Sequence, residues 1–152
     1  MAWIFCSNSF AQNLVTDPDF EGNRRLPHRK ENSIMCTRNW ISPTVSVADY
    51  YHRNSGWYAG VPRNIFGHQK PLSGKAYACI CIRKNLVEYL ETKLSDTLIK
   101  DNQYLIEFYW CRAERSFHRV TEIGVMFTPK LRATAEQQLA LSIKFVTCKR
   151  ES

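Results

Sequence analysis

The sequence predicts an all-β protein, built as an antiparallel β-sandwich, and two features of the chain predict it. The later half carries several segments of strand length in which apolar residues alternate with polar ones or run without interruption. The earlier half is rich in glycine, proline and other turn-forming residues. Short strands joined by turn-rich loops are typical of β-sandwiches and barrels.

The elements follow in chain order. Residues 13–44 and 43–74 are predicted as loops, because polar and turn-forming residues crowd both stretches. The predicted strands are residues 76–82, 86–94, 104–111, 120–128 and 139–147. Residues 104–111 show the clearest alternation, and Asp101 with Asn102 predicts a turn just before them. Only residues 133–141 have a helix-forming composition.

The same alternation predicts which side chains form the core. The residues expected on buried faces are Phe20, Tyr77, Ile80, Leu90, Ile106, Phe108, Ile123 and Phe127. A chain of 152 residues is long enough to enclose one core and too short for two ordinary domains. With 44% hydrophobic and 23% charged residues, a mainly disordered chain is excluded.

Charge and hydropathy narrow the function classes. No run of about 18 apolar residues is present, so no membrane-spanning helix is expected. The net charge of +7 and the basic run at residues 24–30 raise the question of nucleic-acid binding. No DNA- or RNA-binding motif accompanies that run, so nucleic acid is not expected as a partner. The positive charge is more consistent with binding to anionic glycans or to an anionic membrane surface. The simplest interpretation is that it only keeps the domain soluble.

The first residues predict export. Residues 1–11 are similar to the end of a secretory signal, with an apolar patch followed by small and polar residues. The competing interpretation is an apolar N-terminal strand. The expected organisation is therefore a signal-peptide remnant at 1–11, one β-sandwich domain at 12–147 and a tail at 148–152. The expected location is the periplasm, the outer membrane or the outside of the cell.

Cysteine spacing argues against a zinc site. Six cysteines stand at positions 6, 36, 79, 81, 111 and 148. A zinc ribbon needs two C-x-x-C pairs, which are absent, and the four histidines fall in no ligand pattern. Cys79, Cys81 and Cys111 are expected to be buried free thiols in strands.

The order of short motifs along the chain resembles a known family. Residues 13–21, Asn-Leu-Val-Thr-Asp-Pro-Asp-Phe-Glu, are similar to the N-P-x-F-E opening of carbohydrate-binding modules with the galactose-binding-like jelly roll. Further matching segments are residues 40–44, 49–51, 60–64, 66–71, 73–78, 88–94 and 123–127. Together they look like a domain at the front of bacterial outer-membrane proteins that end in an OmpA-like peptidoglycan-binding domain.

The resemblance has consequences for fold and cofactor. It implies a jelly roll over roughly residues 13–128, and a truncated or diverged copy, because residues 129–152 match poorly. It also implies a structural calcium ion ligated by Glu21 together with backbone carbonyls. The competing interpretation makes Phe20 a core side chain and Glu21 a solvated charge.

Loop aromatics are the candidate sugar-binding groups. A flat apolar ring stacks on the C–H face of a sugar, while amide and charged groups bond its hydroxyls. The predicted ligand-binding residues are Trp40, Asp49, Tyr50, Tyr51, Trp57, Tyr58, Asn64 and Gln69, with Asn54 and Arg63 as further candidates. Core packing is the competing interpretation for each aromatic. Trp57 and Tyr58, between Gly56 and Gly60, favour exposure most.

No motif for catalysis is present. The chain lacks a G-x-S-x-G elbow, an H-E-x-x-H pair and a glycine-rich phosphate loop, so a non-enzyme is expected. Two functions remain open. One is a module that binds glycan or a peptidoglycan-related polysaccharide of the bacterial envelope. The other is a structural or adaptor domain that contacts another envelope protein without sugar. Exposure of Trp40, Trp57 and Tyr58 on one plane would favour the first, and their burial the second.

Overall fold

The computed structural model describes residues 12–28, 33–83, 86–129 and 140–150. The predicted signal remnant at residues 1–11 lies outside these ranges, as does most of the segment at 133–141 with helix-forming composition. Within the described ranges, no helix has the length and apolar character needed to cross a membrane.

The all-β class is confirmed. The elements are η1 (Ser33–Cys36), a 3-10 turn, and the strands β1 (Trp40–Ile41), β2 (Asp49–His52), β3 (Arg63–Asn64), β4 (Gly67–His68), β5 (Ala76–Cys79), β6 (Ile82–Arg83), β7 (Leu86–Val87), β8 (Tyr89–Lys93), β9 (His118–Thr128) and β10 (Ala140–Arg150). These described strands form one four-stranded sheet and three two-stranded sheets. The jelly roll itself stays a prediction.

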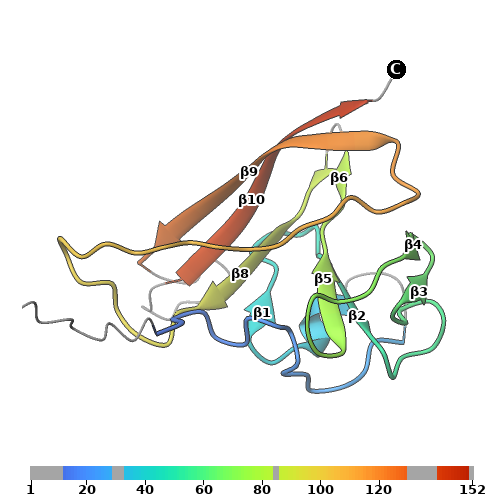
Figure 1. The fold of residues 1–152 in the computed structure, drawn as a ribbon, viewed down its shortest axis with the longest axis horizontal. Helices are drawn as coiled ribbons and strands as arrows, with labels where there is room; N and C mark the ends of the chain where they lie inside the picture. The colour runs from blue at the N-terminus through green and yellow to red at the C-terminus, as the bar shows by residue number, and fades with distance from the viewer. Residues whose placement is uncertain (1–11, 29–32, 84–85, 130–139, 151–152) are drawn as a thin grey trace, which may run out of the picture.

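The four-stranded sheet has the order β1-β8-β10-β9, and all of its pairs are antiparallel (Figure 1). β9 and β10 pair along almost their whole length and confirm the predicted strands at 120–128 and 139–147. β10 also takes up residues 148–150, which the sequence assigned to a tail. On β8, Leu90 lies opposite Ile143 of β10, and Thr92 lies opposite Trp40 of β1. Both edges of β8 are therefore occupied.

A smaller sheet pairs β2 with β5 and contributes Tyr50, Tyr51 and Ala76 to the core. Tyr50 lies opposite Ala78 and Tyr51 opposite Tyr77. All four residues of β2 are buried. Because neighbouring side chains of a strand point to opposite faces, Tyr50 and Tyr51 enter two different apolar clusters. The sequence assigned β2 to a loop, because a strand buried on both faces shows no alternation.

The two clusters lie on either side of β2. The first contains Ile34, Cys36, Trp40, Ala48, Tyr50, Ala76 and Leu90, with Phe20 and Ile80 among the half-buried residues packed against it. The second contains Tyr51, Ala59 and Val61, with Phe66, Tyr77 and Cys79 against it. The core positions predicted for Phe20, Tyr77, Ile80 and Leu90 are confirmed. Phe127 is exposed instead.

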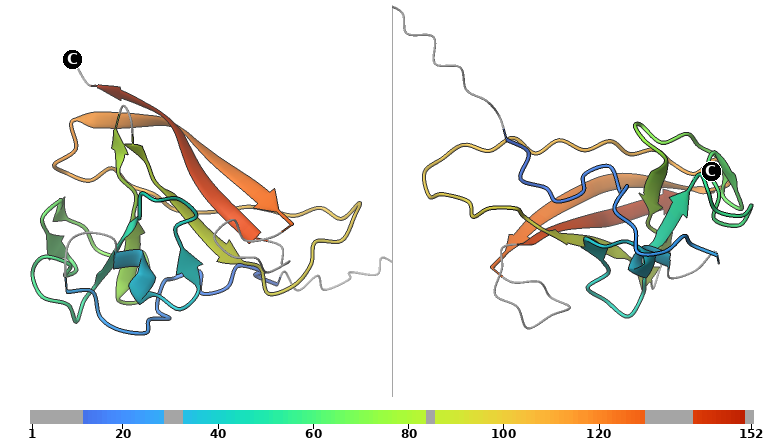
Figure 2. Two further views of the ribbon diagram at one scale, coloured as in Figure 1. Left: turned by 180° about the vertical axis from the view of Figure 1, so that it is seen from behind. Right: turned by 90° about the horizontal axis from the view of Figure 1, so that it is seen from below.

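Residues 104–111 are the main correction to the predicted fold. They are extended but form no strand, and every one of them is exposed. Ile106 and Phe108, expected in the core, keep 44% and 37% of their surface exposed. In Figures 1 and 2 the segment runs across one face of the four-stranded sheet instead of joining it. β8 cannot accept the segment, because β1 and β10 occupy both of its edges, and the segment also pairs with neither of the outer strands, β1 and β9. The predicted turn before the segment is present at residues 100–101, where Asn102 N donates to Ile99 O at 3.3 Å.

Candidate functional site

The loop between β2 and β3, residues 53–62, is closed by its own main-chain hydrogen bonds. Ser55 N donates to His52 O at 2.9 Å, and Ala59 N donates to Gly56 O at 3.1 Å. His52 N in turn donates to Ala59 O at 3.0 Å, which ties the far side of the loop to the end of β2. A loop held in this way has its shape before any ligand arrives, so less ordering entropy opposes binding.

Trp57 and Tyr58 project from this loop into solvent. Their exposed fractions are 66% and 49%, their ring centroids are 4.5 Å apart, and the rings are tilted by 37°. Ala59, Gly60 and Val61, which follow them, are buried and hold that side of the loop inward. We call Trp57 and Tyr58 the aromatic pair. Two neighbouring exposed rings present the kind of apolar face on which a sugar ring stacks.

Three of the predicted sugar-binding aromatics lie in the core. Trp40, Tyr50 and Tyr51 are almost completely buried. Trp40 Nε1 donates to Asp17 O at 2.7 Å, and Tyr50 Oη donates to Phe20 O at 3.0 Å. Their polar atoms thus fasten the N-terminal segment to the core. Side chains buried in this way are not accessible to a sugar. Because Trp40 is buried and the rings of Trp57 and Tyr58 are tilted by 37°, the three do not form one exposed plane, and the predicted surface is reduced to the aromatic pair.

Asn64, another predicted sugar-binding residue, holds the loop in place. Its side chain is buried, and Nδ2 donates to Tyr77 Oη at 2.6 Å and to Gly60 O at 3.3 Å. Its Oδ1 accepts a hydrogen bond from Phe66 N at 2.9 Å. Burial raises the pKa of Tyr77 to about 12, so the phenol remains neutral at physiological pH. Asn64 therefore positions the base of the loop without facing solvent.

Of the remaining polar residues predicted to bind sugar, one is buried and three are exposed. Asp49 is buried in β2, and Gln69 is exposed with Nε2 donating to Lys70 O at 2.8 Å. Asn54 and Arg63 are exposed, one in the loop of the aromatic pair and one at the start of β3. These two side chains are the candidates nearest in sequence to the aromatic pair for bonding sugar hydroxyls.

Protonation of His52, at the base of the loop, is expected to destabilise the protein. His52 is buried, and burial lowers its pKa below the usual 6.5, with the charges of Lys75 and Arg53 acting in the same direction and Glu21 opposing them. Its Nδ1 accepts a hydrogen bond from Asn54 N at 3.1 Å, which protonation would abolish. The unfolded chain binds the proton near pH 6.5 and the folded chain only at lower pH. The free energy of unfolding therefore falls as the pH drops from about 6.5 through the folded pKa.

Urea unfolding of the wild type and His52→Gln on either side of about pH 6.5 measures this effect. The wild type is expected to lose more stability on acidification than the variant. Equal losses in the two proteins would show that His52 is not the responsible group.

Glu21 serves the structure as a hydrogen-bond acceptor. Its Oε1 accepts from Lys75 N, and a Cβ added at Gly74 would overlap the same oxygen. Asp17 Oδ2 nearby in sequence is buried without a hydrogen-bond partner. Calcium takes about six to eight oxygen ligands, and the described residues include no group of three or more histidine, cysteine or acidic side chains placed to share a metal. Calcium at Glu21 stays a prediction, and the contacts favour the structural role.

Four of the described cysteines, Cys36, Cys79, Cys81 and Cys111, form no disulfide. Cys36 is buried, while Cys79 and Cys81 are half-buried. Burial raises the pKa of Cys79 to about 12, which keeps it a neutral thiol. Cys111 is exposed, which corrects the expectation that it is buried.

Comparison with known proteins adds no relative: no family model, no curated protein and no solved structure matches the chain. The candidate site rests on its own geometry. The sequence predicts a strand at residues 104–111 with Ile106 and Phe108 in the core, and gives no indication that the segment forms an exposed apolar surface. No local signal distinguishes the two outcomes, because a paired and an unpaired extended segment have the same alternation.

Proposed function

We propose that this chain is a non-catalytic module of the bacterial cell envelope that binds glycan through Trp57 and Tyr58. The observation that carries the proposal is the aromatic pair, exposed on a loop closed by its own hydrogen bonds. The envelope and the glycan class are supported by the motifs that resemble envelope carbohydrate-binding modules, and by the signal-like residues 1–11.

Ring stacking is expected to supply most of the affinity. The exposed faces of the aromatic pair lose little hydration when they meet the C–H face of a sugar. Hydrogen bonds from Asn54 or Arg63 to sugar hydroxyls replace bonds to water, so each contributes only about 0.5–1.5 kcal/mol net. The polar groups would then set orientation and preference among sugars, and the rings would set the strength of binding.

The substitution Trp57→Ala tests the proposal. A glycan array that includes peptidoglycan fragments identifies the ligand, and calorimetry with that ligand gives the Kd for wild type and variant. By analogy with bases stacked on aromatic side chains, loss of the ring is expected to cost about 1–3 kcal/mol. That corresponds to roughly a tenfold or larger increase in Kd.

Phe117→Ala is the matched control, because Phe117 is an exposed aromatic outside the loop. It is expected to leave the Kd unchanged. The thermal unfolding of Trp57→Ala is also expected to match the wild type, since an exposed ring contributes little to stability. If no glycan binds, or if Trp57→Ala binds as tightly as the wild type, the aromatic pair is not a sugar site.

Arg24 and Arg25 are expected to strengthen the binding of anionic glycans. Both side chains are exposed in the basic run. Neutralising them is expected to weaken binding of charged ligands only, and this loss should fade as salt rises above about 0.15 M. Stacking on Trp57 is insensitive to salt, so a salt titration separates the two contributions.

A protein-contact domain is the second candidate function, and the exposed residues 104–111 favour it. Large exposed apolar patches on a protein surface mark interaction sites. This function predicts that substitutions in residues 104–111 abolish assembly, whereas Trp57→Ala does not.

A further inference from the structure

Residues 104–111, which we call the unpaired segment, have the conformation of a strand without a neighbour. The main chain of residues 103–111 makes no hydrogen bond to any part of the chain that the structure describes. A row of free N–H and C=O groups on an extended segment is a template for pairing with another strand. The segment thus has the geometry of a sheet edge with one position still open.

The C-terminal end of the unpaired segment is held to the domain, and its other end is held to the turn that precedes it. Before it, Tyr104 Oη accepts a hydrogen bond from Ile99 N at 2.7 Å, across the turn at residues 100–101. After it, Glu114 Oε2 accepts from His68 N at 2.9 Å, and Arg115 N donates to Phe66 O at 3.2 Å. Fixed ends reduce the entropy that strand pairing would cost.

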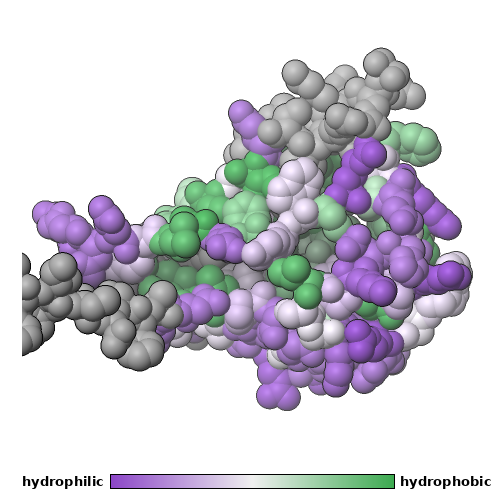
Figure 3. Space-filling view, viewed as in Figure 1, coloured by the Kyte–Doolittle hydropathy of each residue, from purple (hydrophilic) through white to green (hydrophobic). Residues whose placement is uncertain are grey.

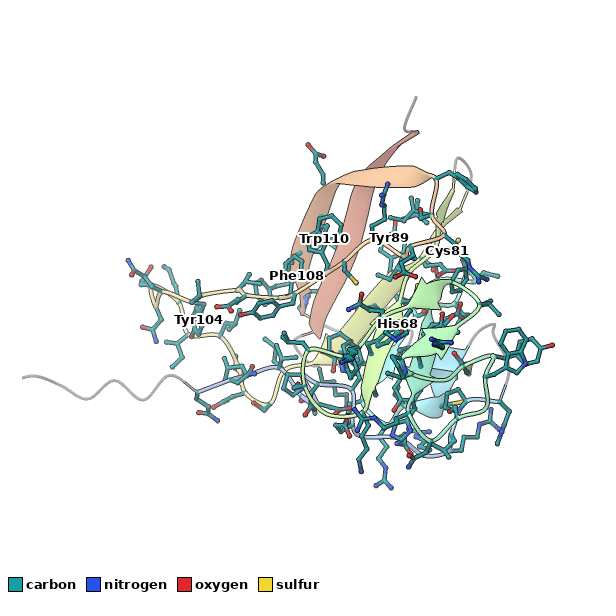
Figure 4. The ribbon with its side chains drawn as sticks, turned by 45° about the vertical axis from the view of Figure 1, so that its right-hand side comes forward. His68, Cys81, Tyr89, Tyr104, Phe108 and Trp110 are labelled. Carbon is teal, nitrogen blue, oxygen red and sulfur yellow. The ribbon has the colours of Figure 1, made fainter. Side chains whose placement is uncertain are left out.

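The side chains of the unpaired segment form an exposed apolar surface. Leu105 and Tyr109 on the outer face are 88% and 70% exposed, and Trp110 on the other face is 52% exposed. Figure 3 shows hydrophobic residues gathered over this part of the molecule, and Figure 4 shows Tyr104, Phe108 and Trp110 following one another along the segment. An exposed extended edge with this many apolar side chains tends to associate with another strand.

We propose that the unpaired segment pairs antiparallel with the same segment of a second copy of this chain, with Phe108 on the two-fold axis. A two-fold axis at one residue makes the segment meet itself, with positions equally far from Phe108 facing each other. The facing residues are then Ile106 with Trp110, Glu107 with Tyr109, Leu105 with Cys111, and Tyr104 with Arg112. The inference is independent of glycan binding.

The sequence of the segment favours this register. Apolar residues face apolar residues at the centre, and Glu107 faces a tyrosine hydroxyl, the same kind of group that it already accepts from Tyr109 at 2.6 Å in its own chain. Moving the axis by one residue to Glu107 would place two carboxylates directly opposite each other, which is destabilising. The self-complementary apolar centre therefore favours a second copy as the partner, and the opposed carboxylates exclude the alignment centred on Glu107.

Oligomeric state and substitution test the interface. In gel filtration with light scattering at micromolar concentrations, the full chain is expected at twice its 17.7 kDa mass. Leu105→Lys places a charge in the apolar face, and Phe108→Lys brings two charges together at the axis. Each is expected to raise the dimer Kd by roughly tenfold or more. Leu72→Lys, at another exposed leucine, is the matched control and should leave the dimer intact.

Disulfide trapping tests the register directly. In a Cys111→Ser background, Phe108→Cys puts two thiols on facing positions, where Cβ atoms are about 4.5–5.5 Å apart. This variant is expected to form a covalent dimer under mild oxidation, whereas Glu107→Cys and Tyr109→Cys are not. The Cys111→Ser parent, oxidised in parallel, accounts for the remaining cysteines.

Three results would overturn the proposal. A chain that stays monomeric at these concentrations would leave the segment to a foreign strand or to another part of a longer protein. A dimer that survives both lysine substitutions would use another surface. Trapping that is strongest at Glu107→Cys would show a different alignment.

Discussion

Replacing Trp40 by alanine is expected to lower the free energy of unfolding by about 3–5 kcal/mol. Trp40 is buried in the first apolar cluster and stacks on Phe20, with ring centroids 4.7 Å apart. Its Nε1 donates to Asp17 O, so the substitution also removes the bond that fastens the N-terminal segment. Urea unfolding followed by far-ultraviolet circular dichroism measures the loss.

Two further variants locate the origin of that loss. Trp40→Phe keeps an aromatic ring against Phe20 but removes the indole donor, so its loss should be smaller than that of Trp40→Ala. Trp57→Ala deletes the same side chain from an exposed position and should leave stability unchanged. Equal destabilisation by Trp40→Ala and Trp57→Ala would contradict the assignment of one tryptophan to the core and the other to the surface.

Replacing Ser33 by alanine is expected to cost about 2–4 kcal/mol, although only one oxygen atom is removed. Ser33 Oγ donates to Tyr50 O at 3.0 Å and accepts from Tyr50 N at 2.6 Å. Both residues are buried, so both main-chain groups of Tyr50 would lose their partner away from water. Each buried polar group left without a partner costs roughly 1–3 kcal/mol.

Ser73→Ala is the control for this substitution, because Ser73 is exposed. It is expected to change the free energy of unfolding by less than about 0.5 kcal/mol. Thermal or urea unfolding of both variants checks the comparison. A Ser33→Ala protein as stable as Ser73→Ala would mean that water or a rearranged side chain replaces the hydroxyl at Tyr50.

Alternation along the chain predicted β9 and β10 well. Both strands are 11 residues long and pair with each other over almost that entire length, so the local preference and the tertiary partner agree. The predicted strand at 86–94 is also present, divided into β7 and β8. A long antiparallel pair is the case in which sequence pattern and structure correspond most directly.

The candidate site was predictable only in part. Glycines on both sides of Trp57 and Tyr58 indicated an exposed loop, and these two rings are exposed. Asn64 and Tyr50 had similar loop-like surroundings in the sequence but are buried, because they contact residues far away in the chain. Asn64 reaches Tyr77, and the Tyr50 main chain bonds to Ser33. A side chain's local neighbours do not reveal such partners.

The sequence by itself determined the all-β class, the long strands of the later half and the extended conformation of residues 104–111. These properties follow from local preferences and from the two-residue period of a strand. Only the tertiary structure decided which extended segments find a partner. Residues 104–111 pair with neither outer strand of the four-stranded sheet, β1 or β9, and their apolar side chains are exposed. Burial and pairing depend on how segments distant in sequence meet, and alternation carries no information about which edge is already occupied.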